Sequence, residues 1–164
     1  MKKKEIIRHG LAVFAIGFLI YFSPSQGIAQ AENSSNNQKS TPMNSYVSIF
    51  EIPATDINRA VKFYQSVLDI SIEQIAFSGM EMGIFPYKEQ MVTGVIIKGE
   101  GYVPSATGTT IYLNGGEDLQ IILDKIENKG GEIIIPKTPH ADENGFFALF
   151  LDSEGNKIGL HSPN

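Results

Sequence analysis

The sequence predicts an α+β domain made of two βαβββ modules, each a four-stranded sheet with one helix. A strand, a helix and three short strands follow one another between residues 46 and 98, and the same order returns between 108 and 162. Such recurrence indicates an internal duplication of structure. Because one helix covers only one face of a sheet, we expect the modules to pair. The paired modules would form a curved, mostly antiparallel sheet with the helices outside.

The first module begins with the β-type run YVSIFEIP (46–53), which ends at Pro53. A helical pattern follows, because apolar side chains recur every three or four residues and Asp56 can cap the first turn. These apolar positions are Ile57, Ala60, Val61, Tyr64 and Leu68. Turn residues separate the next three apolar runs, which predict an antiparallel meander over 70–77, 80–87 and 92–98.

The second module repeats this order after a linker over residues 99–108. The run TTIYLN predicts a strand over 109–114, and an apolar stripe predicts a helix over 117–129. Gly130 and Gly131 can end that helix, because glycine accepts the left-handed conformation. Three further runs predict strands over 132–136, 146–152 and 157–161, and the turn sequence that begins at Asp152 joins the last two.

The N-terminal segment has the pattern of an export signal. Basic residues precede an apolar run from Leu11 to Phe22, which is shorter than the roughly 20 residues of a membrane-spanning helix. Small side chains at Ala29 and Ala31 predict cleavage after Ala31. We therefore expect a secreted or periplasmic protein that meets the membrane only during export. The polar stretch 32–45 predicts a disordered linker ahead of the domain at 46–162.

Composition excludes several classes of function. The chain of 164 residues has no cysteine, so neither disulfides nor thiol chemistry are expected. Removal of residues 1–31 would leave 9 of the 13 basic and 17 of the 18 acidic side chains, a net charge of −8. Nucleic acid is therefore not an expected partner, because an anionic surface repels phosphate backbones.

Three stretches resemble the glyoxalase/bleomycin resistance/dioxygenase superfamily, also called the vicinal oxygen chelate superfamily. They are FEIPATDINRAVKFYQSVL, YLNGGEDLQIILDKIENKGG and LDSEGNKIGLHSP, and the likeness covers residues 46–162. The resemblance implies the paired-module fold. It leaves the activity open, because the superfamily includes isomerases, dioxygenases, transferases and drug-binding proteins.

The resemblance also implies where a metal ion would be held, with one ligand on the first and one on the last strand of each module. The corresponding residues here are Ser48 or Ile49, Ile97, Thr110 and Gly159. None is a competent ligand for a divalent cation, so no metal and no cofactor are expected. The two histidines beyond residue 31 are His140 and His161, and His140 falls in a loop-like stretch with no strand predicted to hold it. An iron site with two histidines is therefore not expected.

Strand alternation selects the candidate site residues. The predicted ligand-binding residues are Thr110, Tyr112, Asn114, Phe147 and His161; ordinary core filling is the alternative, most of all for Phe147 and its neighbour Leu149. Glu51 and His161 are candidates for an acid and a base if Ile49 faces inward. In the other register Glu51 points to solvent or braces the first helix.

These observations favour an exported, metal-independent protein that binds a small organic ligand between its modules. A glyoxalase-like lyase or isomerase, or a dioxygenase with a non-standard site, is one alternative. An interaction module of the cell envelope is another. A homodimer is expected, because the open face of each module needs covering.

Overall fold

A computed structural model describes residues 45–141 and 143–164 of the chain. The predicted export signal (1–31) and residues 32–44 of the predicted linker lie outside the described residues. Within the described part of the chain, no helix is long and apolar enough to cross a membrane.

The first module has the predicted order of elements and forms a four-stranded sheet with the strand order β1-β4-β3-β2. β1 pairs with β4 in parallel, whereas β2, β3 and β4 pair antiparallel. The predicted meander is therefore confirmed. The elements are β1 (Ile49–Pro53), α1 (Ile57–Leu68), β2 (Glu73–Phe77), β3 (Met80–Ile84) and β4 (Thr93–Lys98).

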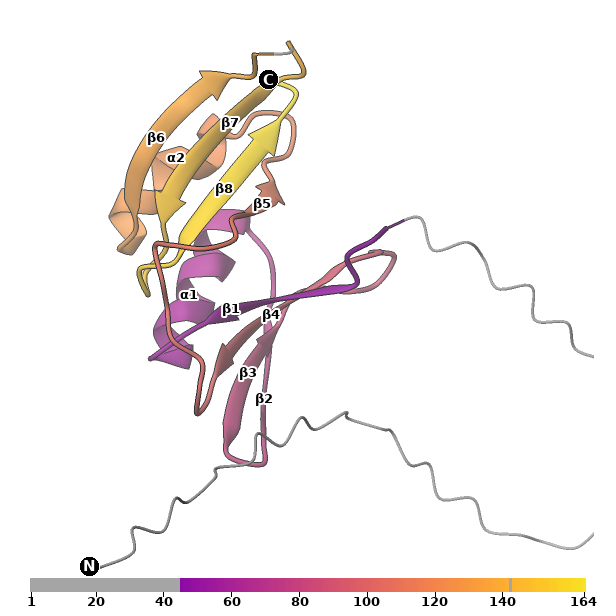
Figure 1. The fold of residues 1–164 in the computed structure, drawn as a ribbon, viewed down its shortest axis with the longest axis vertical. Coiled ribbons are helices and arrows are strands. Elements are labelled where there is room, and N and C mark those ends of the chain that lie inside the picture. Colours follow the sequence, from indigo (N-terminus) through magenta and orange to yellow (C-terminus); the bar gives the residue numbers. More distant parts are fainter. Residues whose placement is uncertain (1–44, 142) are drawn as a thin grey trace, which may run out of the picture. The chain divides into compact units, whose positions relative to one another are not determined.

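The second module repeats this arrangement with the strand order β5-β8-β7-β6, and β5 pairs with β8 in parallel. Figure 1 shows these four strands side by side with α2 behind them. The predicted α+β architecture of two βαβββ modules is confirmed. The elements are β5 (Ile111–Asn114), α2 (Gln120–Ile126), η1 (Glu127–Lys129), β6 (Glu132–Pro139), β7 (Phe146–Leu151) and β8 (Lys157–Ser162).

Local signals set the bounds of α1. The Asp56 side chain accepts a hydrogen bond from the Arg59 amide at 3.0 Å, as an N-cap should, and Asp69 ends the helix in the left-handed conformation. The buried face consists of Ile57, Ala60, Val61, Phe63, Tyr64 and Val67. Four of the five apolar positions predicted from the sequence lie on this face, and Leu68 is partly buried at its edge.

The second helix is shorter than predicted. It begins at Gln120 instead of residue 117, because the Asp118 carboxylate accepts from the Gln120 amide at 2.9 Å and holds the preceding residues in a turn. The amide of Leu119 donates to the Ser162 hydroxyl at 3.0 Å, so β8 satisfies one of the free amides of this helix start. The last three predicted helical residues form the 3₁₀ turn η1.

Several strand bounds also differ from the prediction, among them the start of β1 and the end of β3, and two of the differences have a visible cause. β2 begins only at Glu73. The amide of Ile72 donates to the Gln65 side chain of α1 at 2.9 Å, so it is not available to pair in the sheet. β6 does not end at Pro136 but continues to Pro139, with irregular register between Ile133 and Thr138. Bulges of this kind let a strand continue past a residue that cannot donate a ladder hydrogen bond.

One hydrophobic core joins the two modules. Phe63 of α1 packs on Phe150 of β7 with 6.2 Å between the ring centroids. Tyr64, fully buried, donates from its hydroxyl to the Asp152 carboxylate at 2.7 Å. Burial, and then the negative charge of Asp152, raise the pKa of Tyr64 well above its ordinary value. The phenol therefore stays protonated and donates this hydrogen bond.

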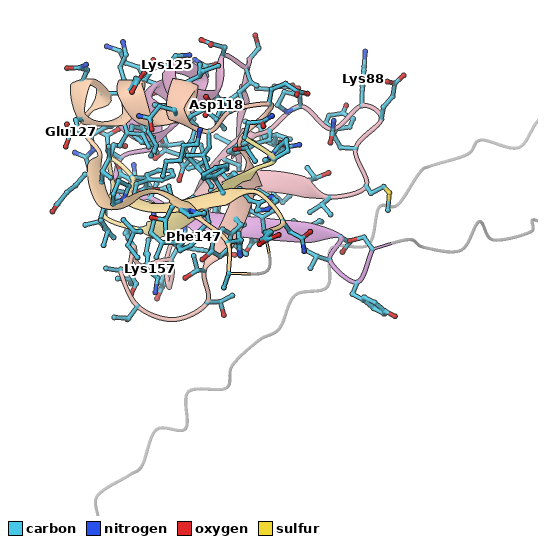
Figure 2. The ribbon with its side chains drawn as sticks, turned by 90° about the horizontal axis from the view of Figure 1, so that it is seen from above. Lys88, Asp118, Lys125, Glu127, Phe147 and Lys157 are labelled. Atoms are coloured by element: carbon cyan, nitrogen blue, oxygen red, sulfur yellow. The ribbon has the colours of Figure 1, made fainter. Side chains whose placement is uncertain are left out.

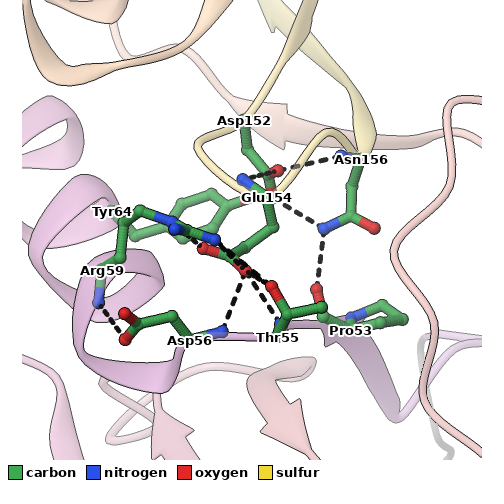
Figure 3. Close-up of polar contacts among 8 residues, drawn as sticks. All are labelled: Pro53, Thr55, Asp56, Arg59, Tyr64, Asp152, Glu154 and Asn156. Atoms are coloured by element: carbon green, nitrogen blue, oxygen red, sulfur yellow. Dashed lines mark hydrogen bonds and ion pairs between the residues drawn. The ribbon is translucent and has the colours of Figure 1, made fainter.

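The turn between β7 and β8 fastens the second module to the first (Figure 3). The Glu154 side chain is excluded from solvent and accepts hydrogen bonds from Thr55, Asp56 and Arg59, at the N-terminus of α1. Asn156 donates to the Pro53 carbonyl oxygen at 2.8 Å. The sequence predicts only a turn here, whereas the structure makes it the main polar contact between the modules.

Candidate functional site

Alternation along the strands gives the second sheet a helix-covered face and an open face. Leu113, Phe150 and Leu160 point into the core and are at most 8% exposed. Tyr112, Phe147 and His161 alternate with core residues and share the opposite face, because β8 pairs Gly159 with Tyr112 and His161 with Phe147. Figure 2 shows Phe147 and Lys157 on the side of the sheet away from Lys125 of α2.

A hollow of about 410 Å³ lies on this open face, lined by Tyr112, His140, Asn144 and His161. The ring of His140 contacts the rings of Phe147 and His161, with centroid distances of 5.0 and 5.3 Å. Nε2 of His161 lies 2.9 Å from the backbone oxygen of Asn144. A phenol, two imidazoles and an amide therefore surround one small space.

The hollow contains two of the predicted ligand-binding residues, Tyr112 and His161. Phe147 does not line the hollow itself, but its ring packs against His140, which does. Thr110 and Asn114, both among the described residues, lie outside its lining: Thr110 precedes β5, and Asn114 uses its side-chain oxygen to accept from the Gly116 amide at 2.9 Å.

His140 is the site residue that the sequence analysis missed. It lies in a loop as predicted, but a strand leads directly up to it and positions it, which the sequence analysis did not expect. β6 runs up to Pro139, and the His140 amide donates to the Gly145 carbonyl at 2.8 Å, which closes the hairpin to β7. The signal was present in the sequence. Asn144-Gly145 directly before the run FFALFL is a strong hairpin pattern, and it implies that another strand ends shortly before it.

The floor of the hollow is formed by Tyr112 and Gly159. A Cβ atom added at Gly159 would lie 2.6 Å from Cε1 and 2.7 Å from Cγ of Tyr112, so the ring rests directly on the glycine backbone. Only a glycine allows this approach. The Tyr112 side chain is still 49% exposed and presents its other ring face outward.

A family model described as "Glyoxalase/Bleomycin resistance protein/Dioxygenase superfamily" matches residues 46–160, which is most of the chain. The chain belongs to this superfamily. A curated glyoxylase-like domain-containing protein from Didymella fabae is 32% identical over 121 residues, covering 67% of this chain and 88% of that protein.

Solved structures of the superfamily share the fold. A glyoxalase I mutant from Zea mays has a TM-score of 0.59 at 16% identity, covering 71% of this chain and 46% of that one. This superfamily protein thus spans just under half of the maize enzyme. TnmS3, an antibiotic binding protein from Streptomyces sp. CB03234, has a TM-score of 0.55 at 19% identity, covering 73% and 97%. A domain from Frankia sp. EAN1pec has a TM-score of 0.58 at 14% identity.

The residues of this superfamily protein do not fit the metal centre that its metal-dependent members use. Ile97 is 3% exposed and has no donor atom, and Gly159 is covered by the Tyr112 ring. Ser48 and Thr110 offer only neutral hydroxyls, which bind divalent cations weakly. Among residues 45–141 and 143–164, no group of three or more His, Cys, Asp or Glu side chains could hold a metal ion.

Glu51 lies on the open face of the first sheet, since β1 turns Phe50 and Ile52 toward the core and pairs Glu51 with Val95. This is the register in which Ile49 shares its face. Burial, followed by the charge of Glu51 and a hydrogen bond to it, raises the pKa of the Tyr102 phenol. Glu51 lines a separate cavity of about 150 Å³. The structure therefore does not bring Glu51 and His161 together as an acid–base pair.

A further cavity, of about 560 Å³, lies on the helix side between the two modules. Its walls are mainly apolar and include Phe50, Phe85, Leu113 and Ile122. At its rim, Lys125 forms an ion pair with Asp69 of the other module. The sequence does not predict this cavity, because the residues of its two walls lie far apart in the sequence.

Proposed function

We propose that this protein binds a small, planar organic molecule in the hollow on the open face of the second sheet, without the metal centre of its metal-dependent relatives. One observation carries the proposal: the Tyr112 ring rests on Gly159, where those relatives would place a metal ligand. A stacking surface thus occupies the position of a coordinating side chain.

The groups around this ring suit a ligand that is planar and forms hydrogen bonds. The phenol of Tyr112 and the imidazoles of His140 and His161 can each donate or accept, and the Asn144 amide can do both. Sites for small molecules combine a flat apolar surface with a few polar groups in this way. The antibiotic-binding character of TnmS3 supports a binding role on this fold, although at 19% identity the likeness extends to the fold alone.

A thermal-shift screen with planar aromatic compounds, in buffer with EDTA, tests this proposal. A ligand at 100 times its Kd should stabilise the protein by about 2.7 kcal/mol. We expect at least one such compound, and we expect Tyr112→Ala to abolish its effect. Tyr87→Ala is the matched control, because Tyr87 is 57% exposed in the first module. A screen without stabilising compounds, or full binding by Tyr112→Ala, would contradict the proposal.

We also propose that the protein acts after export, on the evidence of its N-terminal sequence. The basic residues and the short apolar run at 11–22 support a cleaved signal. Fractionation of producing cells, followed by N-terminal sequencing of the exported protein, should give a chain that begins at Glu32. Leu19→Arg, which interrupts the apolar run, should keep the full-length chain inside the cell. Recovery of the unchanged wild-type chain from the cytoplasm alone would exclude export.

A homodimer is the proposed assembly, with the open face of the first sheet as the contact. Three large apolar side chains on this face are exposed: Ile49 by 60%, Ile75 by 39% and Phe77 by 64%. Apolar patches of this kind often mark protein interfaces. Light scattering should give the mass of two chains, and Phe77→Ser should shift it to one. Ile121→Ser, at a 60% exposed position on α2 of the second module, should leave the dimer intact. A wild-type monomer at high concentration would exclude the dimer.

A further inference from the structure

Two imidazoles from different parts of the second module meet in the hollow. His140 follows the end of β6, His161 lies on β8, and their ring centroids are 5.3 Å apart with the planes at 65°. A divalent transition metal holds an imidazole nitrogen at about 2.0–2.1 Å, so two rings on one ion have centres about 4.5–5.5 Å apart. The observed spacing falls in this range.

A backbone carbonyl orients the ring of His161. Its Nε2 lies 2.9 Å from the Asn144 oxygen, and because a carbonyl oxygen only accepts, Nε2 carries the proton. An imidazole with its proton on Nε2 has the lone pair that can bind a metal on Nδ1. Histidines that bind metals usually donate their other ring N–H to a carbonyl or carboxylate in this manner. The contact with Asn144 is thus a second observation in favour of a metal ligand at His161.

We propose that His140 and His161 together bind one divalent transition-metal ion, with its remaining positions open to water. Imidazole ligands suit Cu²⁺, Ni²⁺ and Zn²⁺, and Cu²⁺ should bind most tightly. The site differs from the metal centre of the superfamily, whose position on β8 is Gly159, two residues before His161. It does not depend on the proposed organic ligand, because the stacking surface for that ligand is Tyr112.

Titration of the full chain with Cu²⁺ tests the site, by calorimetry and by electron paramagnetic resonance. We expect one ion per chain and a spectrum with two imidazole nitrogens as ligands. His140→Gln and His161→Gln should each weaken the affinity at least tenfold and leave one imidazole nitrogen in the spectrum. His9→Gln is the matched control, because it removes the third histidine of the chain. It should change neither the affinity nor the spectrum.

Two further measurements keep the outcome decisive. Circular dichroism of both variants in EDTA should match the wild type, since neither ring belongs to the hydrophobic core. Tyr112→Ala should retain Cu²⁺ affinity within about threefold while it loses the aromatic ligand. Equal Cu²⁺ affinity in the wild type and both His→Gln variants would overturn the proposal, as would a spectrum without nitrogen ligands.

Discussion

In both modules an aromatic ring of the first strand lies over a glycine of the last strand, but the two rings point to opposite faces. Phe50 pairs with Gly94 and packs into the core beside Phe85. Tyr112 pairs with Gly159 and lies on the open face. In both pairs a large ring packs on the backbone of a glycine in the neighbouring strand, where no side chain is in the way. The aromatic–glycine pair therefore occurs in both modules. In the first module it stabilises the core, and in the second, as we propose, it forms a binding surface.

The turns that precede the last strands differ as well. In the first module the connection from β3 to β4 is largely exposed over residues 86–91. In the second, Asp152 and Asn156 at the two ends of the turn are buried, and the residues between them are half-buried beside α1. Only one of the two corresponding turns thus links the modules, so the duplication is not symmetric. Substitutions in the linking turn, Asp152 to Asn156, should therefore lower stability more than substitutions at the two glycine pairs.

Asp152→Ala should have the largest effect, because it removes the acceptor at the centre of the linking turn. Asp152 is 3% exposed and accepts from Tyr64, Asn156 and the Glu154 amide. Leaving these donors without a partner should lower the free energy of unfolding by about 3–5 kcal/mol. Urea unfolding followed by circular dichroism measures this loss. Tyr64→Phe, which removes one of the bonds, should lower it by about 1 kcal/mol. Equal stabilities of Asp152→Ala and the wild type would show that this turn does not couple the modules.

Gly94→Ala should be the more damaging of the two glycine substitutions. Its Cβ would lie 2.6 Å from Cζ of Phe50 and 3.1 Å from Cδ2 of Phe85, and both rings are held by the core. Overpacking of this kind typically costs about 1–3 kcal/mol. Thermal and urea unfolding should both register the loss. A stability equal to that of the wild type would mean that Phe50 can move as freely as a surface ring.

Gly159→Ala should change binding more than stability. The new Cβ would displace the Tyr112 ring, which is half-exposed and free to turn outward, so the loss of stability should be below about 1 kcal/mol. The compounds found in the thermal-shift screen should no longer bind. Tyr112→Ala combined with Gly159→Ala should be no less stable than Tyr112→Ala alone, because the clash is gone. Normal binding of these compounds by the Gly159→Ala protein would show that Tyr112 is not part of the binding site.

The elements that the sequence predicts well are those with local signals. The start of α1 follows from the Asp56 cap, whose hydrogen bond to Arg59 lies within one turn, and from an apolar face within the same helix. The end of β6 depends instead on its pairing with β7, because Thr138 and Pro139 remain in the sheet only opposite Phe147 and Phe146. Pro136 is a local signal for a strand end, but this non-local pairing outweighs it, so the sequence did not predict that a strand leads directly up to His140.

The site shows the same division between local and distant information. Alternation along β5 and β8 is local, and it places Tyr112 and His161 on one face correctly. The close approach of Tyr112 to Gly159 depends on the register between two strands more than 40 residues apart in sequence. Glu154 contacts Thr55 over a separation of 99 residues, which no pattern near either residue indicates.

The smallest effect that we predict is a pH dependence of stability that Glu154 causes. Burial opposes its ionisation, but hydrogen bonds from Arg59, Asp56 and Thr55 outweigh burial and lower its pKa below the ordinary 4.5. The unfolded chain therefore binds a proton at higher pH than the folded one. The stabilising contribution is complete above about pH 4.5 and is lost as pH falls through the lower folded-state pKa. Urea unfolding at pH 6, 5, 4 and 3 measures it.

The two turns supply the controls for this dependence. Glu154→Gln removes the ionisable group and should flatten the decline between pH 5 and 3, although it lowers stability at neutral pH. Glu89→Gln, in the exposed turn of the first module, should leave the decline unchanged. If both variants follow the wild-type pH profile, the Arg59–Glu154 contact does not stabilise the ionised carboxylate. The two turns would then differ in how they pack, and not in the electrostatic contribution that each makes to stability.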